Sequence, residues 1–190
     1  MFVKEMVKQS LPLLILCGLG AVVAGSILGL MNAPDPESNL FIRIPGLIVV
    51  IPAIIAMRGN ISSAFGSRLG SAYHLGVIDV DNLWNKELNE NIFGSFVLSL
   101  LTSTFIGILA YITSFILGVY PNPFLIISIV VVSGLISGIV LNILTIGIIY
   151  IVFKRGYDPD NITGPALATF GDIITILCIY TSILLLGGLI

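Results

Sequence analysis

Charged residues are scarce in this chain: only 9% of its 190 residues are Asp, Glu, Lys or Arg. Soluble domains carry about 25% of these residues, so the composition excludes an ordinary soluble domain. The single histidine and the two cysteines are too few for a Cys/His metal cluster built within one chain. We also expect no nucleic-acid partner.

The sequence also lacks the signatures of common enzymes. It contains no nucleophile elbow, no HExxH helix and no phosphate-binding P-loop. Ser and Thr within apolar runs usually hydrogen-bond to their own helix, so we predict that the chain is not an enzyme. Cys17 and Cys178 lie in different apolar runs, where buried packing is expected and a disulfide or shared metal is the alternative.

Long apolar runs are what the sequence has in abundance. Hydrophobic residues make up 57% of the chain, and the mean hydropathy is +1.12. A membrane-spanning helix needs about 20 apolar residues, and the longest run without charge, residues 91–153, is divided at Pro121-Asn122-Pro123. We therefore predict an all-α membrane protein, a single domain over residues 1–190, with five spans near residues 8–31, 40–57, 92–118, 124–153 and 163–189.

The basic residues indicate how the chain crosses the membrane, because Lys and Arg close to spans tend to stay in the cytoplasm. The predicted protein is multi-pass in the cell membrane, with a cytoplasmic N-terminus and an external C-terminus. The first apolar run is too long for a signal peptide, so we expect it to be retained. This orientation places seven of the eight basic residues inside: Lys4, Lys8, Arg58, Arg68, Lys86, Lys154 and Arg155.

Residues 58–76 are too polar for lipid but carry an apolar residue at every fourth position from Ile61 to Tyr73. This spacing predicts that the second helix continues into the cytoplasm. Small residues four positions apart let helix backbones approach closely, either within one chain or between two copies. Both readings are open for the three glycine pairs: Gly25 and Gly29, Gly66 and Gly70, and Gly134 and Gly138.

Asp172 stands alone in the last apolar run. If that span begins near residues 161–164, Asp172 lies about 12–16 Å inside it, close to the midplane of a hydrocarbon core about 30 Å thick. A charge there is costly and usually faces water or a partner. Thr169, Ala168 and Pro165 precede Asp172 by three, four and seven positions and share its face. Pro165 also frees a carbonyl one turn earlier, and carbonyl and carboxylate oxygens suit a hard cation.

A second candidate pore wall is the run PGLIVVIPAIIAMRGN at residues 45–60. Pro52 is expected to interrupt the helix, and Gly59 and Asn60 to break or bend it at its cytoplasmic end. Irregular backbone at membrane depth is tolerated where it faces water or is buried in protein, so we expect Asn60 near the inner mouth. The alternative is that Pro52 kinks a packing helix and Asn60 caps the next one. Thr175 is a further pore-lining candidate.

A site with one carboxylate and little other charge suits a cation that keeps its water. Mg²⁺ dehydrates reluctantly and commonly binds through one or two carboxylates plus waters, whereas His74 alone offers little to a softer metal and is expected to be an interfacial polar residue. Two copies around a twofold axis would bring two Asp172 carboxylates together, and the ion would relieve their repulsion. We therefore predict a homodimer in the lipid bilayer that moves Mg²⁺.

Two segments, PAIIAMRGNISSAFGSRLGSAYHLG at 52–76 and DPDNITGPALATFGDIITI at 158–176, resemble the membrane domain of MgtE-type magnesium channels and transporters. That family includes eukaryotic solute-carrier relatives and archaeal half-length counterparts. The resemblance implies a homodimer of five-helix subunits with a cation path between the second and fifth helices. It also implies hydrated Mg²⁺ held at Asp172 with help from the Ala168 carbonyl, and it matches Asn60 to the asparagine of the family's GN motif.

The sequence departs from the family pattern in two places. About seven residues precede the first predicted helix, so no cytoplasmic magnesium-sensing gate is expected. Arg58 stands where bacterial members tend to have glycine, and at the inner mouth its charge would need a partner such as Asp79 or Asp81.

Several functional alternatives remain open. A non-transporting membrane subunit or scaffold could pair Asp172 with a partner's basic residue, and a carrier of another solute could use it as a proton relay. The residues do not rank Mg²⁺ against Mn²⁺, Co²⁺ or Ca²⁺, and they do not separate a channel from a coupled exchanger.

Overall fold

The structure, a computed structural model, describes residues 2–78, 84–155 and 159–187. Five of its helices are long and apolar enough to cross a membrane, so the predicted all-α multi-pass membrane protein with five spans is confirmed. The short α2 is an addition that the sequence did not predict. In chain order the helices are α1 (Phe2–Met31), α2 (Leu40–Arg43), α3 (Leu47–His74), α4 (Lys86–Ile116), α5 (Pro123–Lys154) and α6 (Pro159–Leu185).

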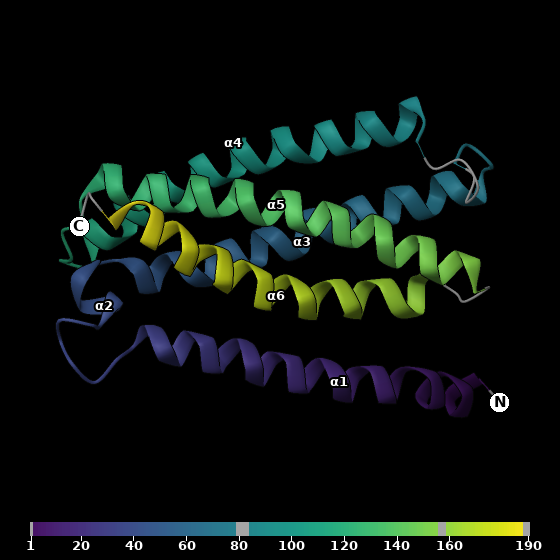
Figure 1. The fold of residues 1–190 in the computed structure, drawn as a ribbon, viewed down its shortest axis with the longest axis horizontal. Helices are drawn as coiled ribbons and strands as arrows, with labels where there is room; N and C mark the ends of the chain where they lie inside the picture. The colour runs from purple at the N-terminus through teal and green to yellow at the C-terminus, as the bar shows by residue number, and fades with distance from the viewer. Residues whose placement is uncertain (1, 79–83, 156–158, 188–190) are drawn as a thin grey trace.

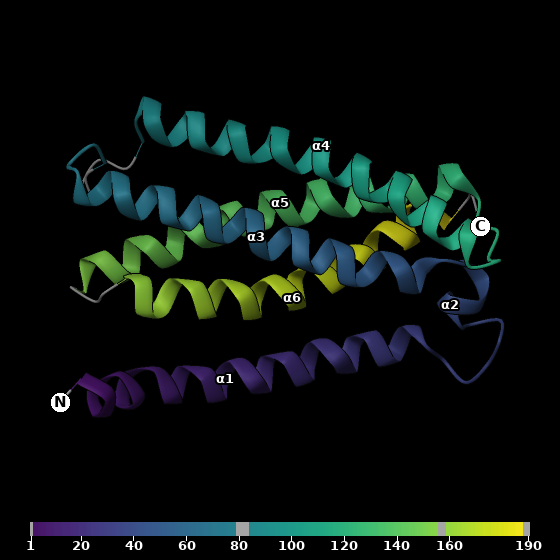
Figure 2. The same cartoon turned by 180° about the vertical axis from the view of Figure 1, so that it is seen from behind.

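The five long helices run roughly along one axis (Figures 1 and 2). α3 and α5 pack against each other and against both α4 and α6, whereas α1 lies along α6 at the side of this group (Figure 1). The start of α1 and the end of α6 lie at opposite ends of the bundle (Figure 1), as an odd number of spans requires. α6 therefore lies between α1 and the rest of the bundle.

The break in the second predicted helix lies before Leu47 rather than at Pro52. α2 ends at Arg43 and α3 begins at Leu47, with a turn at Gly46, whose φ is +86°. The predicted interruption at Pro52 is wrong, because α3 runs through that proline and on to His74 without a break at Gly59 or Asn60. Buried Ile51 and Ile54 flank Pro52, and packing of this kind holds a helix in place despite the loss of one hydrogen bond.

The predicted division of the longest apolar run is confirmed. α4 ends at Ile116 and α5 begins at Pro123, and the side chain of Asn122 accepts hydrogen bonds from the backbone N–H groups of Phe124 and Leu125 at 3.0 and 3.3 Å. This is the usual helix N-cap, and proline fits the first helical position because its missing N–H needs no partner there.

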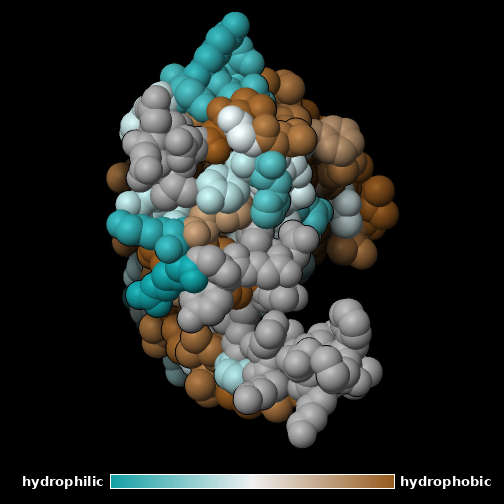
Figure 3. Space-filling model, turned by 90° about the vertical axis from the view of Figure 1, so that its right-hand side faces the viewer, coloured by the Kyte–Doolittle hydropathy of each residue, from teal (hydrophilic) through white to brown (hydrophobic). Residues whose placement is uncertain are grey.

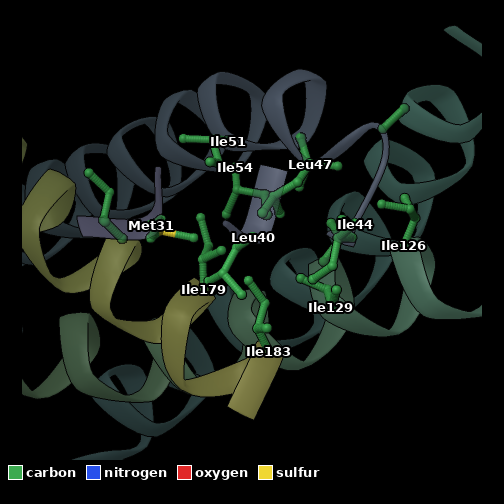
Figure 4. Packing of buried hydrophobic residues seen from close by; sticks show 14 of the residues in the cluster. Met31, Leu40, Ile44, Leu47, Ile51, Ile54, Ile126, Ile129, Ile179 and Ile183 are labelled. Carbon is green, nitrogen blue, oxygen red and sulfur yellow. The ribbon is translucent and has the colours of Figure 1, made fainter. Parts of the chain in front are cut away.

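Two hydrophobic clusters lie toward opposite ends of the bundle. The larger one joins all six helices through side chains that include Met31, Leu40, Ile54, Ile129 and Ile179 (Figure 4). On α3, α4 and α5 a set of small polar residues and one arginine separates the two clusters. The smaller cluster consists of Phe65, Leu69, Ala72, Ile78, Leu88 and Ile149, and the buried polar set between the clusters contains Arg58, Ser95, Ser99, Ser103, Ser133, Ser137 and Asn142.

The surface matches a bundle that is longer than a bilayer is thick. The long helices contain 27 to 32 residues, or about 40–48 Å at 1.5 Å per residue, compared with about 30 Å for the hydrocarbon core. Hydrophilic side chains gather at the end of the bundle where α3 ends, and hydrophobic ones cover its flanks (Figure 3). The polar helix ends are therefore suited to lie beyond the lipid.

Two glycines in left-handed backbone conformations differ in how closely they are packed. Gly46 has a φ of +86° and Gly118 a φ of +77°, so alanine at either position should cost about 1–3 kcal/mol in strain. A Cβ on Gly46 would also lie 2.7 Å from the Ser114 Oγ, whereas nothing lies within 4 Å of one on Gly118. In thermal unfolding of the purified protein, we expect Gly46→Ala to lower the melting temperature more than Gly118→Ala. Equal shifts would contradict the close contact with Ser114.

Candidate cation pathway

Asp172 is the middle residue of α6 (Pro159–Leu185), so it lies about 20 Å from each end of the helix. Its side chain is half-buried. Among the described residues it makes no hydrogen bond, and the single ion pair there joins exposed Lys86 to Glu90 at 3.6 Å. That part of the chain also holds no group of three His, Cys, Asp or Glu side chains. Among the described residues, one chain therefore offers a single carboxylate near the middle of a long apolar helix.

The polar groups of Pro165 and Thr169 are engaged at the contact between α1 and α6. The Thr169 hydroxyl donates to the Pro165 carbonyl at 3.1 Å, and the Cys17 thiol of α1 donates to the same oxygen at 3.3 Å. A Cβ added to Gly20 of α1 would overlap with the Thr169 Cγ2. We predicted both α6 residues on the pore face, and the structure shows that α1 already contacts them.

The contact between Gly20 and Thr169 predicts a specific steric effect. Gly20→Ala should force α1 away from α6 and cost about 1–3 kcal/mol, as overpacking usually does. Thr169→Ser removes the opposing methyl group and should restore most of the loss in the double variant. Thermal unfolding of the purified variants measures both effects. Gly18→Ala is the matched control, because nothing lies within 4 Å of a Cβ at that position, and an equal loss there would contradict the contact.

Ala168 and Thr175 lie in different surroundings on α6. Ala168, one turn before Asp172, is exposed, so this part of the Asp172 face is open in the single chain. Thr175 is fully buried, and its Oγ1 has no hydrogen-bond partner among the described residues. Of these two predicted pore residues, only Ala168 is accessible.

The predicted pore residues of α3 lie along its less buried side. Pro52 and Asn60 are exposed and Gly59 is half-buried. Hollows occur on either side of Asn60 along this helix. One, of about 310 Å³, lies between α3 and α6 and is lined by residues that include Ser63, Ser67, Ser71, His74, Thr163 and Gly164. The other, of about 450 Å³, lies among α1, α2 and α3 and is lined by residues that include Gly25, Gly29, Asn32, Phe41, Ile48 and Pro52.

His74 is an exposed residue at the end of α3. Its ring packs edge-on against Phe153 of α5, with 5.6 Å between the ring centroids. It also lines the hollow between α3 and α6, which fits the predicted polar position near a helix end.

Comparison with known proteins supplies the family. A model of the MgtE family, described as divalent cation transporters, matches residues 51–182. The chain belongs to the MgtE family. The matched region contains all of the predicted pore residues and runs from α3 to near the end of α6.

Relatives of this MgtE-family chain include human solute carrier family 41 member 2, which is 30% identical over 179 residues, or 90% of this chain and 30% of that protein. The Xenopus laevis protein of the same description is 31% identical over 179 residues, with the same coverage. Solute carrier family 41 member 3 of Rattus norvegicus is 27% identical over 176 residues, or 89% of this chain and 36% of that protein. The chain thus spans about a third of the length of these relatives. No solved structure matches it.

The position of Arg58 corrects an expectation for this MgtE-family chain. We expected its charge at the inner mouth of the pore, but the side chain is only 1% exposed and lies inside the bundle against Gly138 of α5. Asn60, two residues later, is exposed instead, because positions two apart point to nearly opposite sides of a helix. The suggested partners Asp79 and Asp81 lie outside the described residues.

The contacts of α1 with α6 are the second feature that sequence reasoning missed. Cys17 was expected in buried apolar packing, but its half-buried thiol bonds to the Pro165 carbonyl. Cys178 is buried as expected, and both thiols are free. The small side chain at Gly20 could have indicated a close helix contact. The sequence does not show, however, that α1 packs against the face of α6 that carries Pro165 and Thr169.

The spacing of the glycine pairs left open whether they pack within one chain or between two copies, and the structure gives different results for different pairs. Gly134 and Gly138 pack within the chain, because a Cβ on either would lie 2.7 Å or less from a side chain of α4 or α3. Gly66 likewise packs on Leu167 of α6, with 3.2 Å between an added Cβ and Leu167 Cδ1. Gly25 and Gly29 have nothing within 4 Å, so a contact between two copies stays a prediction for that pair.

Proposed function

We propose that the chain carries divalent cations, above all Mg²⁺, across the membrane past Asp172. The observation that carries this proposal is an ionisable side chain at the centre of a membrane helix, without a hydrogen bond or ion pair to any described residue. Such residues usually face a water-filled path and mark the route of an ion. Membership of a family of divalent cation transporters supports the same assignment.

The pathway that we propose runs between α3 and α6 of two copies related by a twofold axis. One carboxylate is a poor divalent site, whereas two Asp172 side chains facing each other would bind one ion and lose their mutual repulsion. Exposed Ala168 and Asn60 belong to the same surface in this arrangement, and the Ala168 carbonyl contributes an oxygen. Pro52 and Gly59 lie on the same side of α3 as Asn60 and line the α3 part of the pathway.

The ion is proposed to pass with much of its water attached. The hollow between α3 and α6 presents three serines at successive turns, Ser63, Ser67 and Ser71, and its lining contains no acidic side chain. Hydroxyl groups can bind the outer waters of a hydrated ion but replace its inner shell poorly. Mg²⁺ fits this chemistry, because it keeps several waters and binds through one or two carboxylates.

The distribution of basic residues supports an orientation in which α1 begins on the cytoplasmic side. The end of the bundle that carries Arg68, Lys86 and Lys154 then faces the cytoplasm together with the hollow between α3 and α6. The hollow lined by Pro52 faces the exterior.

Flux measured with the purified chain tests this function. Liposomes that contain the protein and a trapped Mg²⁺ indicator should report Mg²⁺ entry that protein-free liposomes do not show. Absence of flux from the chain alone would favour a non-transporting subunit. Transport of a monovalent ion or an organic solute at a rate that does not depend on Mg²⁺ would favour a proton-coupled carrier instead.

A further inference from the structure

Arg58 is the largest fully buried side chain in the described part of the protein, with 1% of its surface exposed. Its Nε and Nη2 atoms have no hydrogen-bond partner among the described residues. Its Nη1 lies against Gly138 of α5, where an added Cβ would be 2.7 Å from that nitrogen. A cation in this position is costly unless a negative charge opposes it.

The groups near Arg58 are uncharged side chains, among them the free thiol of Cys178 on α6. Ser99, which also borders Gly138, donates its hydroxyl proton to the Ser95 carbonyl at 2.6 Å. The amide of Asn142 donates to the Ser95 hydroxyl, also at 2.6 Å. These contacts supply polarity but no counter-charge. Among the described residues, a negative charge that balances Arg58 therefore acts from a greater distance.

Among the residues that the structure describes, Asp172 is the one acid near the middle of a helix. Every other described acid lies in the connection between α1 and α2 or within the first five residues of a helix. A Cβ on Gly66 would contact Thr163 and Leu167 at 3.3 and 3.2 Å, which aligns antiparallel α3 and α6 at that height. From there, the helical rise carries Arg58 about 12 Å and Asp172 about 10 Å in the same direction.

We propose that Arg58 is the fixed counter-charge of Asp172 and determines how tightly the pathway holds a divalent cation. This inference rests on the proposed function. Without an ion, the guanidinium offsets the negative carboxylate through the low-dielectric core. With an ion present, the same positive charge repels it and favours its release toward either side.

The expected size of the effect follows from the geometry. Packed helix axes lie about 8–10 Å apart, so charges on neighbouring helices at the same depth are about 10–12 Å apart. At an effective dielectric constant of about 20, Coulomb's law over that distance corresponds to about a tenfold change in affinity per unit charge. Removing the charge of Arg58 should therefore tighten Mg²⁺ binding at least about tenfold.

The test compares Arg58→Met with Arg58→Lys, which keeps the charge, in the purified full chain. The apparent Mg²⁺ affinity is measured from the rise in melting temperature during Mg²⁺ titration. We expect Arg58→Met to shift the half-saturating Mg²⁺ concentration at least about tenfold lower and Arg58→Lys to leave it within about twofold. In the Asp172→Asn background, neither substitution should restore a Mg²⁺-dependent rise. Equal Mg²⁺ affinities for the Met and Lys variants would overturn the proposal.

A second measurement without divalent ions separates this inference from the proposed function. In a double-mutant cycle, the protein with both Arg58→Met and Asp172→Asn should be more stable than the sum of the two single losses predicts. Each single variant leaves one charge without its counter-charge, whereas the double variant removes both charges. Additive changes in melting temperature would contradict the counter-charge. If the parental protein neither binds nor moves Mg²⁺, the proposed function fails, and this cycle still decides whether the two charges are coupled.

Discussion

Asp172→Asn is expected to lower Mg²⁺ flux through reconstituted protein at least about 100-fold. The substitution keeps the shape of the side chain and removes its charge from the middle of α6. At an effective dielectric constant of about 20, unit charges 4 Å apart attract each other by about 4 kcal/mol, and each 1.4 kcal/mol is a factor of ten. The measurement is the initial rate of Mg²⁺ entry into liposomes at matched protein density.

Glu37→Gln is the matched control for loss of an acid, because Glu37 is exposed in the connection between α1 and α2. It should retain the parental flux. Asp172→Asn protein that remains monodisperse and carries Mg²⁺ at the parental rate would contradict the role assigned to the carboxylate.

Ala168→Trp is expected to block flux almost completely while leaving the subunit folded. Ala168 is exposed and lies one turn before Asp172 on the same face of α6. A large side chain therefore has room in the single chain but would fill the space between two copies. Flux in liposomes, together with the melting temperature of the purified variant, separates obstruction of the pathway from unfolding.

Phe170→Trp is the control on the same helix. Phe170 is also exposed, but it is two positions away from both Ala168 and Asp172, so it points to nearly the opposite side of α6. This variant should transport normally. Parental flux in Ala168→Trp, or equal loss in both tryptophan variants, would place the pathway elsewhere.

The five long helices were predictable because uninterrupted apolar runs and proline-rich turns act locally. Pro121-Asn122-Pro123 marks the end of one span and the start of the next, and the Asn122 cap is formed from neighbouring residues. The break at Gly46 was missed because Pro52 looked like the stronger interruption. Tertiary packing on both sides of Pro52 keeps the helix continuous there, and the local sequence pattern does not reveal that packing.

The candidate site was predictable in part for the same reason. The depth of Asp172 follows from its position in one apolar run, and the structure places it at the middle of α6. The burial of Arg58 was not predictable, because it depends on small residues of two other helices, such as Gly138 and Ser99, meeting around the guanidinium. The direction of Thr169 toward α1 likewise depends on Gly20, which is remote in sequence.

The measurement that tests the central claim most directly is an experimental structure of the protein in lipid with Mn²⁺, which scatters more strongly than Mg²⁺ and prefers the same oxygen ligands. We predict two copies whose α3 and α6 faces meet, with ion density between the two Asp172 carboxylates. Asp172 side chains that face lipid or a basic residue, with no ion density between copies, would contradict the account.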